Sequence, residues 1–397
     1  MVSLVRLSIL MASLILLGGC QPGEAPPLDQ QVYIWQRQWT PAHEGALSDS
    51  RGDFSTLRIL ALQAFPGEGW VRARINPALL KADGRPVIAV VRLDGQLRSL
   101  NQGEILAQIQ QVLTDWTEQG VIISGVEIDH DAGTARLPEY QKLLVHLRSA
   151  LRTSLTLSIT ALPSWLNSRA LPALLASVDS SVLQVHAVDD PRKGLFDPTQ
   201  ARKWAVQWSS VTAKPFYLAL PAYGVALLTG DGVPRVESEV ALDQGGERRE
   251  LLADPQQLSQ LAAELRSDQL KHLAGLIWFR LPLSNDRRAW SLTTLRAVVQ
   301  GVPLDSRLSL KVSGRQGLHD ISLSNEGNLD TAWPVRMTLA VKGCEGADAL
   351  AGYTLQQSPE LLTFTRQREG RILAGGQRAI GWARCTSIEQ GNSNVYP

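Results

Sequence analysis

Three carboxylates lie two residues apart in the segment SGVEIDHD at 124–131, which follows an apolar run. Successive side chains of a β-strand point to opposite faces, so Glu127, Asp129 and Asp131 are expected on one face of one strand. Like charges at the end of a buried strand are costly unless they are hydrogen-bonded or partly protonated. The spacing therefore predicts acids with perturbed pKa values, which general acid catalysis needs. The alternative is that these acids cap a helix or form ordinary salt bridges.

Eight apolar segments are predicted to be strands, with helical patterns between them. Near-continuous apolar strands separated by helices indicate parallel pairing, and eight such units in roughly 270 residues match an α/β fold, the (β/α)8 TIM barrel. In such a barrel, catalytic groups lie at the strand ends. An open doubly wound sheet competes, but the first strand–helix turn has no GxGxxG fingerprint. The strand candidates are 32–39, 57–65, 86–93, 122–129, 155–163, 181–188, 216–224 and 273–282, and the main helix candidates are 103–119, 138–152, 198–210, 255–270 and 287–300.

The pattern changes after the barrel segment, which we place at 31–301. Short alternating runs at 302–389, separated by turn residues, predict a small antiparallel domain that resembles a β-sandwich, and 390–397 reads as a polar tail. The long connection 225–253 follows the seventh strand, and we expect a hairpin there that overhangs the barrel mouth.

The N-terminus combines Arg6 with an apolar run at 7–17 that is too short to span a membrane and is typical of a signal peptide. The sequence LGGC, ending at Cys20, resembles the lipobox of bacterial lipoproteins. This resemblance implies a signal peptide at 1–19, acylation of Cys20 with fatty acids such as palmitate, and a tether at 20–30. Gln21 in place of aspartate implies an outer-membrane location, on either the periplasmic or the surface face. An ordinary secretory signal is the alternative.

Cysteine usage predicts a disulfide and no metal site. With Cys20 assigned to the lipid, Cys344 and Cys385 remain as an even pair in an oxidising compartment, which predicts a disulfide. No zinc-ligand spacing occurs, so we expect no metal and no cofactor.

The formal charge of +1 is spread without a basic stripe, which argues against nucleic-acid binding. The motifs GxSxG, SxxK and HExxH are absent, so serine-hydrolase and metalloprotease functions have no support. The sequence leaves the oligomeric state open.

Residues 31–301 resemble the family-18 glycoside hydrolases, the chitinase-like barrels. The fourth strand of that family carries DGxDxDxE, and SGVEIDHD fits the same frame. In that frame Gly125 stands at the glycine, Glu127 and Asp129 at two aspartates, and Asp131 at the catalytic glutamate. We also expect a closer relationship to an uncharacterised bacterial lipoprotein family of barrels of this type.

Three later strands carry similar motifs. HAVDD is similar to the family's MxYD and sets His186, Val188 and Asp189 at its methionine, tyrosine and aspartate. LALPAYG is similar to GLPxYG, with Tyr223 aligned, and GLIWFRLP sets Trp278 at the tryptophan that floors the sugar subsite. For His186, a structural role is as plausible as a catalytic one.

The resemblance implies substrate-assisted hydrolysis of an amino-sugar polysaccharide, in which the sugar's own acetamido oxygen attacks. Asp131 would be the acid, Asp129 would orient the acetamide, and Glu127 would tune Asp129 through a shared proton. A plain glycosidase that uses Glu127 or Asp189 as its second carboxylate remains open.

Departures from the family pattern favour a second function. Ser124 replaces the first aspartate, Val188 the tyrosine and Asp131 the glutamate. Aspartate is one methylene shorter, and a misplacement of about 1 Å can cost on the order of 100-fold in rate. The alternative is a catalytically inactive barrel that binds glycan or protein at the outer membrane.

Two further residues complete the expected site. Trp35 falls at the presumed open face, where an indole could stack on a sugar ring, although burial in the core is equally plausible for any tryptophan. Arg92 ends the third strand and could be a fixed counter-charge for the acids, or could form a salt bridge elsewhere.

Overall fold

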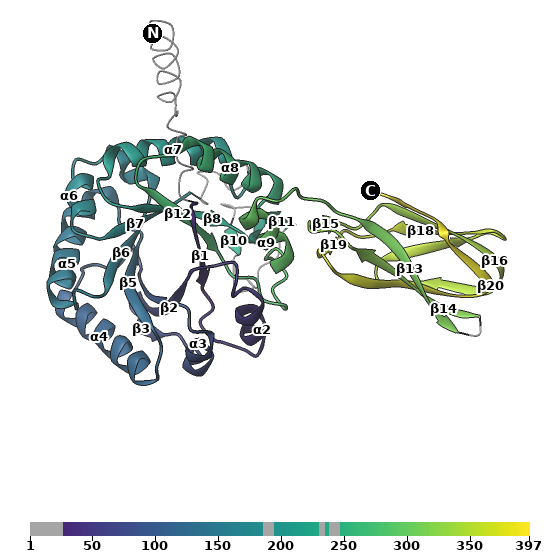
Figure 1. Ribbon diagram of the computed structural model, residues 1–397, viewed down its shortest axis with the longest axis horizontal. Coiled ribbons are helices and arrows are strands. Elements are labelled where there is room, and N and C mark those ends of the chain that lie inside the picture. The colour runs from purple at the N-terminus through teal and green to yellow at the C-terminus, as the bar shows by residue number, and fades with distance from the viewer. Residues whose placement is uncertain (1–26, 186–193, 230–234, 238–246, 316) are drawn as a thin grey trace, which may run out of the picture.

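The computed structural model describes residues 27–185, 194–229, 235–237, 247–315 and 317–397. Eight parallel strands form a closed barrel at its centre, because β1 pairs with both β12 and β2 (Figure 1). This confirms the expected (β/α)8 barrel, and each strand overlaps a segment predicted from the sequence. The barrel strands are β1 (Asp29–Ile34), β2 (Thr56–Phe65), β4 (Val87–Leu93), β5 (Ile123–His130), β6 (Thr156–Ala161), β7 (Ser180–Gln184), β8 (Phe216–Pro221) and β12 (Leu273–Phe279).

Helices surround the strands as an outer layer (Figure 1). Several begin at a side chain that accepts a backbone N–H of the first turn: Asn101 caps α4, Asp197 caps α7 and Asp254 caps α8. Their apolar stripes face the strands and cover the outer face of the parallel sheet. The helices are α2 (Ala42–Asp49), α3 (Pro77–Asp83), α4 (Gln102–Glu118), α5 (Leu137–Ala150), α6 (Leu171–Ala176), α7 (Pro198–Val211), α8 (Pro255–Asp268) and α9 (Leu292–Gln300), with 3-10 turns η1 (Thr134–Arg136) and η2 (Pro163–Asn167).

Side chains alternate along each strand between the barrel interior and the outer shell. An inner apolar cluster includes Tyr33, Val90, Val182, Ala219 and Ile277. Their sequence neighbours on the same strands point the other way and pack against the helices. A shift of one residue therefore separates a side chain in the barrel interior from one in the outer shell.

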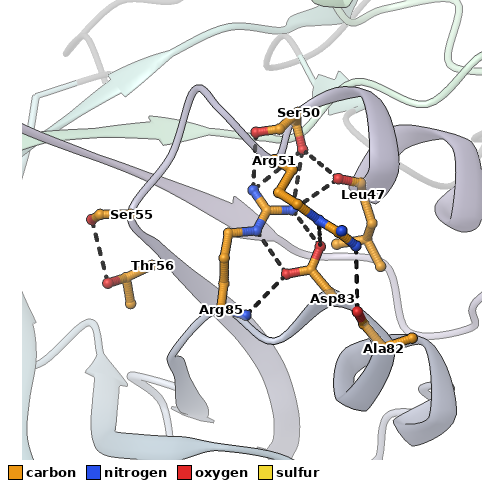
Figure 2. A network of polar contacts seen from close by, with 8 residues as sticks. All are labelled: Leu47, Ser50, Arg51, Ser55, Thr56, Ala82, Asp83 and Arg85. Atoms are coloured by element: carbon orange, nitrogen blue, oxygen red, sulfur yellow. Dashed lines mark hydrogen bonds and ion pairs between the residues drawn. The ribbon is translucent and has the colours of Figure 1, made fainter.

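A buried arginine ties the first helices to the start of β4 (Figure 2). Arg85 binds both carboxylate oxygens of Asp83, with Nε–Oδ1 at 2.7 Å and Nη2–Oδ2 at 2.8 Å. It also donates to the carbonyl oxygens of Ser50 and Leu47, each at 3.0 Å. The same guanidinium thus satisfies carbonyls at the end of α2 and fixes the turn between α3 and β4.

Two additions extend the barrel near the carboxyl ends of its strands. β3 (Gly69–Arg72) pairs antiparallel with the end of β2. The connection after β8 forms a three-stranded antiparallel sheet in which β9 (Gly224–Thr229) lies between β10 (Arg235–Glu237) and β11 (Glu247–Leu252). The hairpin expected at 225–253 is therefore present and carries a third strand.

The C-terminal region forms a separate β domain beside the barrel (Figure 1). Its six-stranded sheet has the order β13-β14-β20-β16-β18-β17, and β15 and β19 pair separately. The expected disulfide joins Cys344 on β16 to Cys385 on β20. Residues 390–396, expected as a polar tail, instead extend β20, and 393–396 pair with β16, because backbone pairing does not require apolar side chains. The strands are β13 (Leu308–Arg315), β14 (Leu318–Asn325), β15 (Thr331–Ala332), β16 (Arg336–Ala349), β17 (Tyr353–Gln357), β18 (Leu361–Arg366), β19 (Arg371–Ile372) and β20 (Gln377–Tyr396).

A buried aspartate of the β domain contacts the last barrel helix. Asp330 accepts the backbone N–H of Ser291, the N-cap of α9, at 2.7 Å, and its own N–H donates to Thr294 Oγ1 at 2.9 Å. Its second oxygen accepts the N–H of Ala374 at 2.8 Å. Arg371 adds a hydrogen bond to the carbonyl of Ala289 at 2.7 Å.

None of the helices within the described ranges is long and apolar enough to cross a membrane.

Candidate active site

A cavity of about 420 Å³ opens at the carboxyl ends of the barrel strands. This is the end at which (β/α)8 enzymes keep their chemistry. Among the described residues, five lining side chains are aromatic, and the others include two carboxylates, three arginines and two amides. The lining residues are Tyr33, Trp35, Arg37, Gln63, Phe65, Arg92, Asp129, Asp131, Thr160, Gln184, Ala219, Tyr223, Phe279 and Arg280.

One arginine connects the two carboxylates of the cavity. Arg92 Nη1 lies 2.7 Å from Asp129 Oδ2, and Nη2 lies 3.0 Å from Asp131 Oδ2. Register explains this contact, because Arg92 pairs with Asp129 across β4 and β5. The expected role of Arg92 as a fixed counter-charge therefore agrees with the geometry.

The two aspartates lie in different surroundings. Asp129 is buried, and its Oδ1 accepts Thr160 Oγ1 at 2.6 Å and Gln184 Nε2 at 3.2 Å. The side chain of Asp131 is 36% exposed and lies at the rim. Asp129 is thus held by neighbours on three strands, whereas Asp131 is open to a ligand.

Burial and charge shift the protonation of this group. Partial burial raises the pKa of Asp131, the Asp129 carboxylate raises it further, and Arg92 opposes both. Burial disfavours the charge on Arg92, but the two carboxylates outweigh it and raise the pKa of that guanidinium. Asp131 is therefore an acid that keeps its proton to a higher pH than an ordinary aspartate, next to a permanent cation.

Glu127 lies below the cavity in a fully buried polar layer. Its Oε1 accepts Tyr33 Oη at 2.6 Å, its Oε2 accepts Ser158 Oγ at 3.2 Å, and Arg58 forms an ion pair with Oε2. Arg58 Nε donates to Gln31 Oε1 at 2.8 Å. Burial raises the pKa of Glu127, while Arg58 and the Tyr33 hydroxyl act in the opposite direction.

This arrangement corrects the expectation that Glu127 shares a proton with Asp129. The oxygens of Glu127 are engaged by Tyr33, Arg58 and Ser158, and those of Asp129 by Arg92, Thr160 and Gln184. The two acids lie on one strand face, as predicted, but successive inward positions belong to successive layers of a barrel. Glu127 therefore supports the floor of the site and does not line it.

Trp278 does not line the cavity, which corrects the expectation that its indole forms the floor of a sugar subsite. Its side chain is fully buried in the outer shell, its Nε1 donates to Gln30 Oε1 at 2.9 Å, and its ring lies 6.3 Å from that of Trp290. The inward positions of β12 are Ile277 and Phe279, so the aromatic side chain at the cavity is Phe279. The motif comparison therefore selected Trp278, which faces outward, and not its neighbour Phe279, which faces the cavity.

An aromatic wall stands opposite the acids. Phe279 has its ring 5.1 Å from that of Trp35 and 5.2 Å from that of Tyr223, and Trp35 also contacts the ring of Tyr33 at 5.8 Å. Trp35 and Tyr223, both expected from the sequence, line the cavity. Aromatic faces of this kind pack against apolar C–H surfaces such as those of a sugar ring.

Several of the residues named from the sequence are not among the described residues. His186 and Asp189 fall outside the described residues, as do Val188 and Cys20. Among the residues that the structure describes, no group of three or more His, Cys, Asp or Glu side chains could hold a metal ion.

Sequence reasoning missed Arg58, Tyr33, Thr160 and Gln184. Arg58 had a signal, because it is the only charged residue in the apolar segment TLRILALQAF and a buried charge needs a partner. Thr160 and Gln184 are ordinary residues of apolar strands and become informative only through their contacts with Asp129.

The model of a family described as a domain of unknown function, DUF3142, matches residues 83–284, just over half of the chain. The chain belongs to this family. The matched segment of the DUF3142 domain contains all the cavity residues contributed by β4 to β12. A second model, also described as a domain of unknown function, DUF8456, matches residues 308–386 in the β domain. No curated protein sequence matches the chain.

Solved structures resemble this DUF3142 member in fold. A chitinase from Bacteroides thetaiotaomicron superposes with a TM-score of 0.51 at 12% identity, over 69% of this chain and 96% of that one. The Bacillus cereus spore cortex-lytic enzyme SleL gives 0.49 at 12% identity, over 70% and 75% of the two chains. A family GH18 chitinase from Chromobacterium violaceum gives 0.44 at 11% identity, over 93% and 91%. The expected resemblance to the chitinase-like barrels is confirmed at the level of fold.

Proposed function

We propose that this protein is a glycoside hydrolase that acts on an amino-sugar polysaccharide. The observation that carries the proposal is the convergence of Asp129 and Asp131 on Arg92, opposite the aromatic wall of the barrel cavity. Carboxylates supply the proton transfer, and the aromatic rings supply a surface for the sugar. The glycoside-hydrolase-like fold supports the same conclusion.

Asp131 is the candidate acid. In substrate-assisted hydrolysis the acetamido oxygen of the sugar attacks the anomeric carbon, the glycosidic C–O bond breaks, and an acid gives its proton to the leaving oxygen. The raised pKa of Asp131 and its position at the rim suit this step. Buried Asp129, held by Thr160 and Gln184, would orient the acetamide.

The test is release of reducing ends from chitin-type, peptidoglycan-type and galactosaminogalactan-type polymers. We expect turnover of one class by the wild type and its loss in Asp131→Ala. Asp115→Ala is the matched control, because the side chain of Asp115 is also 36% exposed and also paired with an arginine, Arg72, but lies on α4. A folded wild type that cleaves none of the three polymers would contradict the proposal.

The second candidate function is a glycan- or protein-binding barrel without catalysis. The ion pair between Arg92 and Asp131 favours it, because the cation lowers the pKa of Asp131 and so favours the ionised carboxylate, which has no proton to give to a leaving group. The test is Asp131→Glu, which restores the residue of the family motif. Unchanged glycan affinity with activity gained would support the binding function, and full activity in the wild type would exclude it.

We further propose that the protein is a lipoprotein anchored in the outer membrane through Cys20. The lipobox resemblance at 17–20 supports this location, and Gln21 favours the outer membrane. Incorporation of labelled palmitate by the wild type and its loss in Cys20→Ser are the expected results. Recovery of wild-type protein in the soluble fraction without label would contradict the anchor.

A further inference from the structure

The arginines of the cavity differ in how their charges are used. Arg92 is paired with Asp129 and Asp131, and Arg280 is paired with Asp286 at 2.6 Å. Arg37 also lines the cavity, but it forms no ion pair with any residue in the described ranges. Its charge is therefore available to a ligand.

The side chain of Arg37 packs against an aromatic ring, a contact that leaves its hydrogen-bond donors unused. The guanidinium carbon lies 5.2 Å from the centroid of Phe65, which lines the same cavity. The guanidinium is planar, and packing against an aromatic ring leaves its N–H donors free; two of these parallel donors match the two oxygens of a carboxylate.

A second arginine adds positive charge at the same edge. The backbone N–H of Arg74 donates to the carbonyl of Arg37 at 2.7 Å, so the two residues are adjacent on paired segments. Arg74 is exposed and, like Arg37, has no ion pair within the part of the chain that the structure describes. Asp129 lies on β5 and Asp131 directly after it, and β2 and β4 separate β5 from β1. The cavity is thus acidic at β5 and basic beyond β1.

From this polarity we infer that the Arg37 edge of the cavity binds a carboxylate carried by the substrate, so that the glycan is an acidic amino-sugar polysaccharide. The inference rests on the proposed function and names its substrate class. A neutral polymer of N-acetylated sugars would leave Arg37 without a partner. An acidic one would place the carboxylate of a neighbouring ring at Arg37 while the reacting ring lies at Asp131.

The test is calorimetric binding to full-length protein that carries Asp131→Asn, so that no glycan is cleaved. Two carboxylated probes distinguish the source of the charge: a tetrasaccharide of alternating N-acetylglucosamine and glucuronic acid, and peptide-free peptidoglycan strands with lactyl carboxylates. Each probe is paired with its own methyl ester, which removes the charge and keeps the sugar. We expect at least one acid to bind about tenfold more tightly than its ester, with weaker binding as salt rises.

Adding Arg37→Gln should remove that tenfold preference and leave the affinity for the ester unchanged. Arg152→Gln is the matched control, since Arg152 is also exposed but precedes β6, at the opposite end of the barrel. Equal binding of acid and ester, or a preference that survives Arg37→Gln, would overturn this inference and leave the proposed function standing. Failure of both acids and both esters to bind would overturn the two together.

Discussion

Replacing Arg58 by methionine should destabilise the barrel more than any surface substitution. The side chains of Arg58 and Glu127 are 1% and 0% exposed, so loss of the arginine leaves a carboxylate in the interior with only Tyr33 and Ser158 as donors. Removing one partner of a buried ion pair costs about 3–5 kcal/mol. A substitution of the exposed Arg152 should stay within about 0.5 kcal/mol.

Urea unfolding at pH 7, followed by tryptophan fluorescence, measures the free energy of unfolding of Arg58→Met. Arg58→Met with Glu127→Leu removes both charges and should recover most of the loss, because an apolar pair of similar volume replaces the ion pair. A loss below about 1 kcal/mol for Arg58→Met, or additive losses in the double variant, would refute the reasoning.

The same variant has a defined dependence on pH. Arg58 lowers the pKa of Glu127, which burial raises above its ordinary value of 4.5, so removing Arg58 raises that pKa further. A carboxyl whose pKa is raised in the folded state favours folding below pH 4.5 and loses this contribution as the pH rises through the raised pKa. The deficit of Arg58→Met should therefore be smaller at pH 4.5 than at pH 7, and an equal deficit at both would contradict it.

Three further predictions concern the cavity. Asp131→Asn should lower the rate of reducing-end release by at least about 100-fold while glycan affinity by calorimetry changes less than about threefold. Arg92→Gln removes a cation that lowers the pKa of Asp131, so the alkaline limb of the pH–rate profile, where Asp131 loses its proton, should move to higher pH. Trp35→Ala should weaken glycan binding about tenfold, whereas Trp278→Ala should reduce stability by about 3–5 kcal/mol and leave the affinity of the remaining folded protein unchanged.

The barrel could be predicted because its strands are nearly continuous apolar runs of the right length and number. The face of β5 could also be predicted, since its acids alternate with Val126, Ile128 and His130 and so fix the phase. His130 lies in the outer shell, with its Nδ1 2.8 Å from the Leu93 carbonyl oxygen.

The phase of β12 could not be obtained in the same way. Trp278 and Phe279 are adjacent and both aromatic, so alternation does not say which of them faces inward. The structure resolves this through contacts between distant strands, where Phe279 meets Trp35 and Tyr223. The partner of Arg58 was hidden for a similar reason, because Glu127 is 69 residues away in sequence.

Asp330 links the folding free energies of the two parts of the chain. Its side chain is only 2% exposed and accepts from the N-cap of α9, so loss of the β domain removes an acceptor from the first turn of the helix that completes the barrel. Substitutions in 308–396 that unfold this domain should consequently lower the melting temperature of the barrel as well. The stability of the barrel, and so of the cavity, thus depends on a domain none of whose described residues line that cavity.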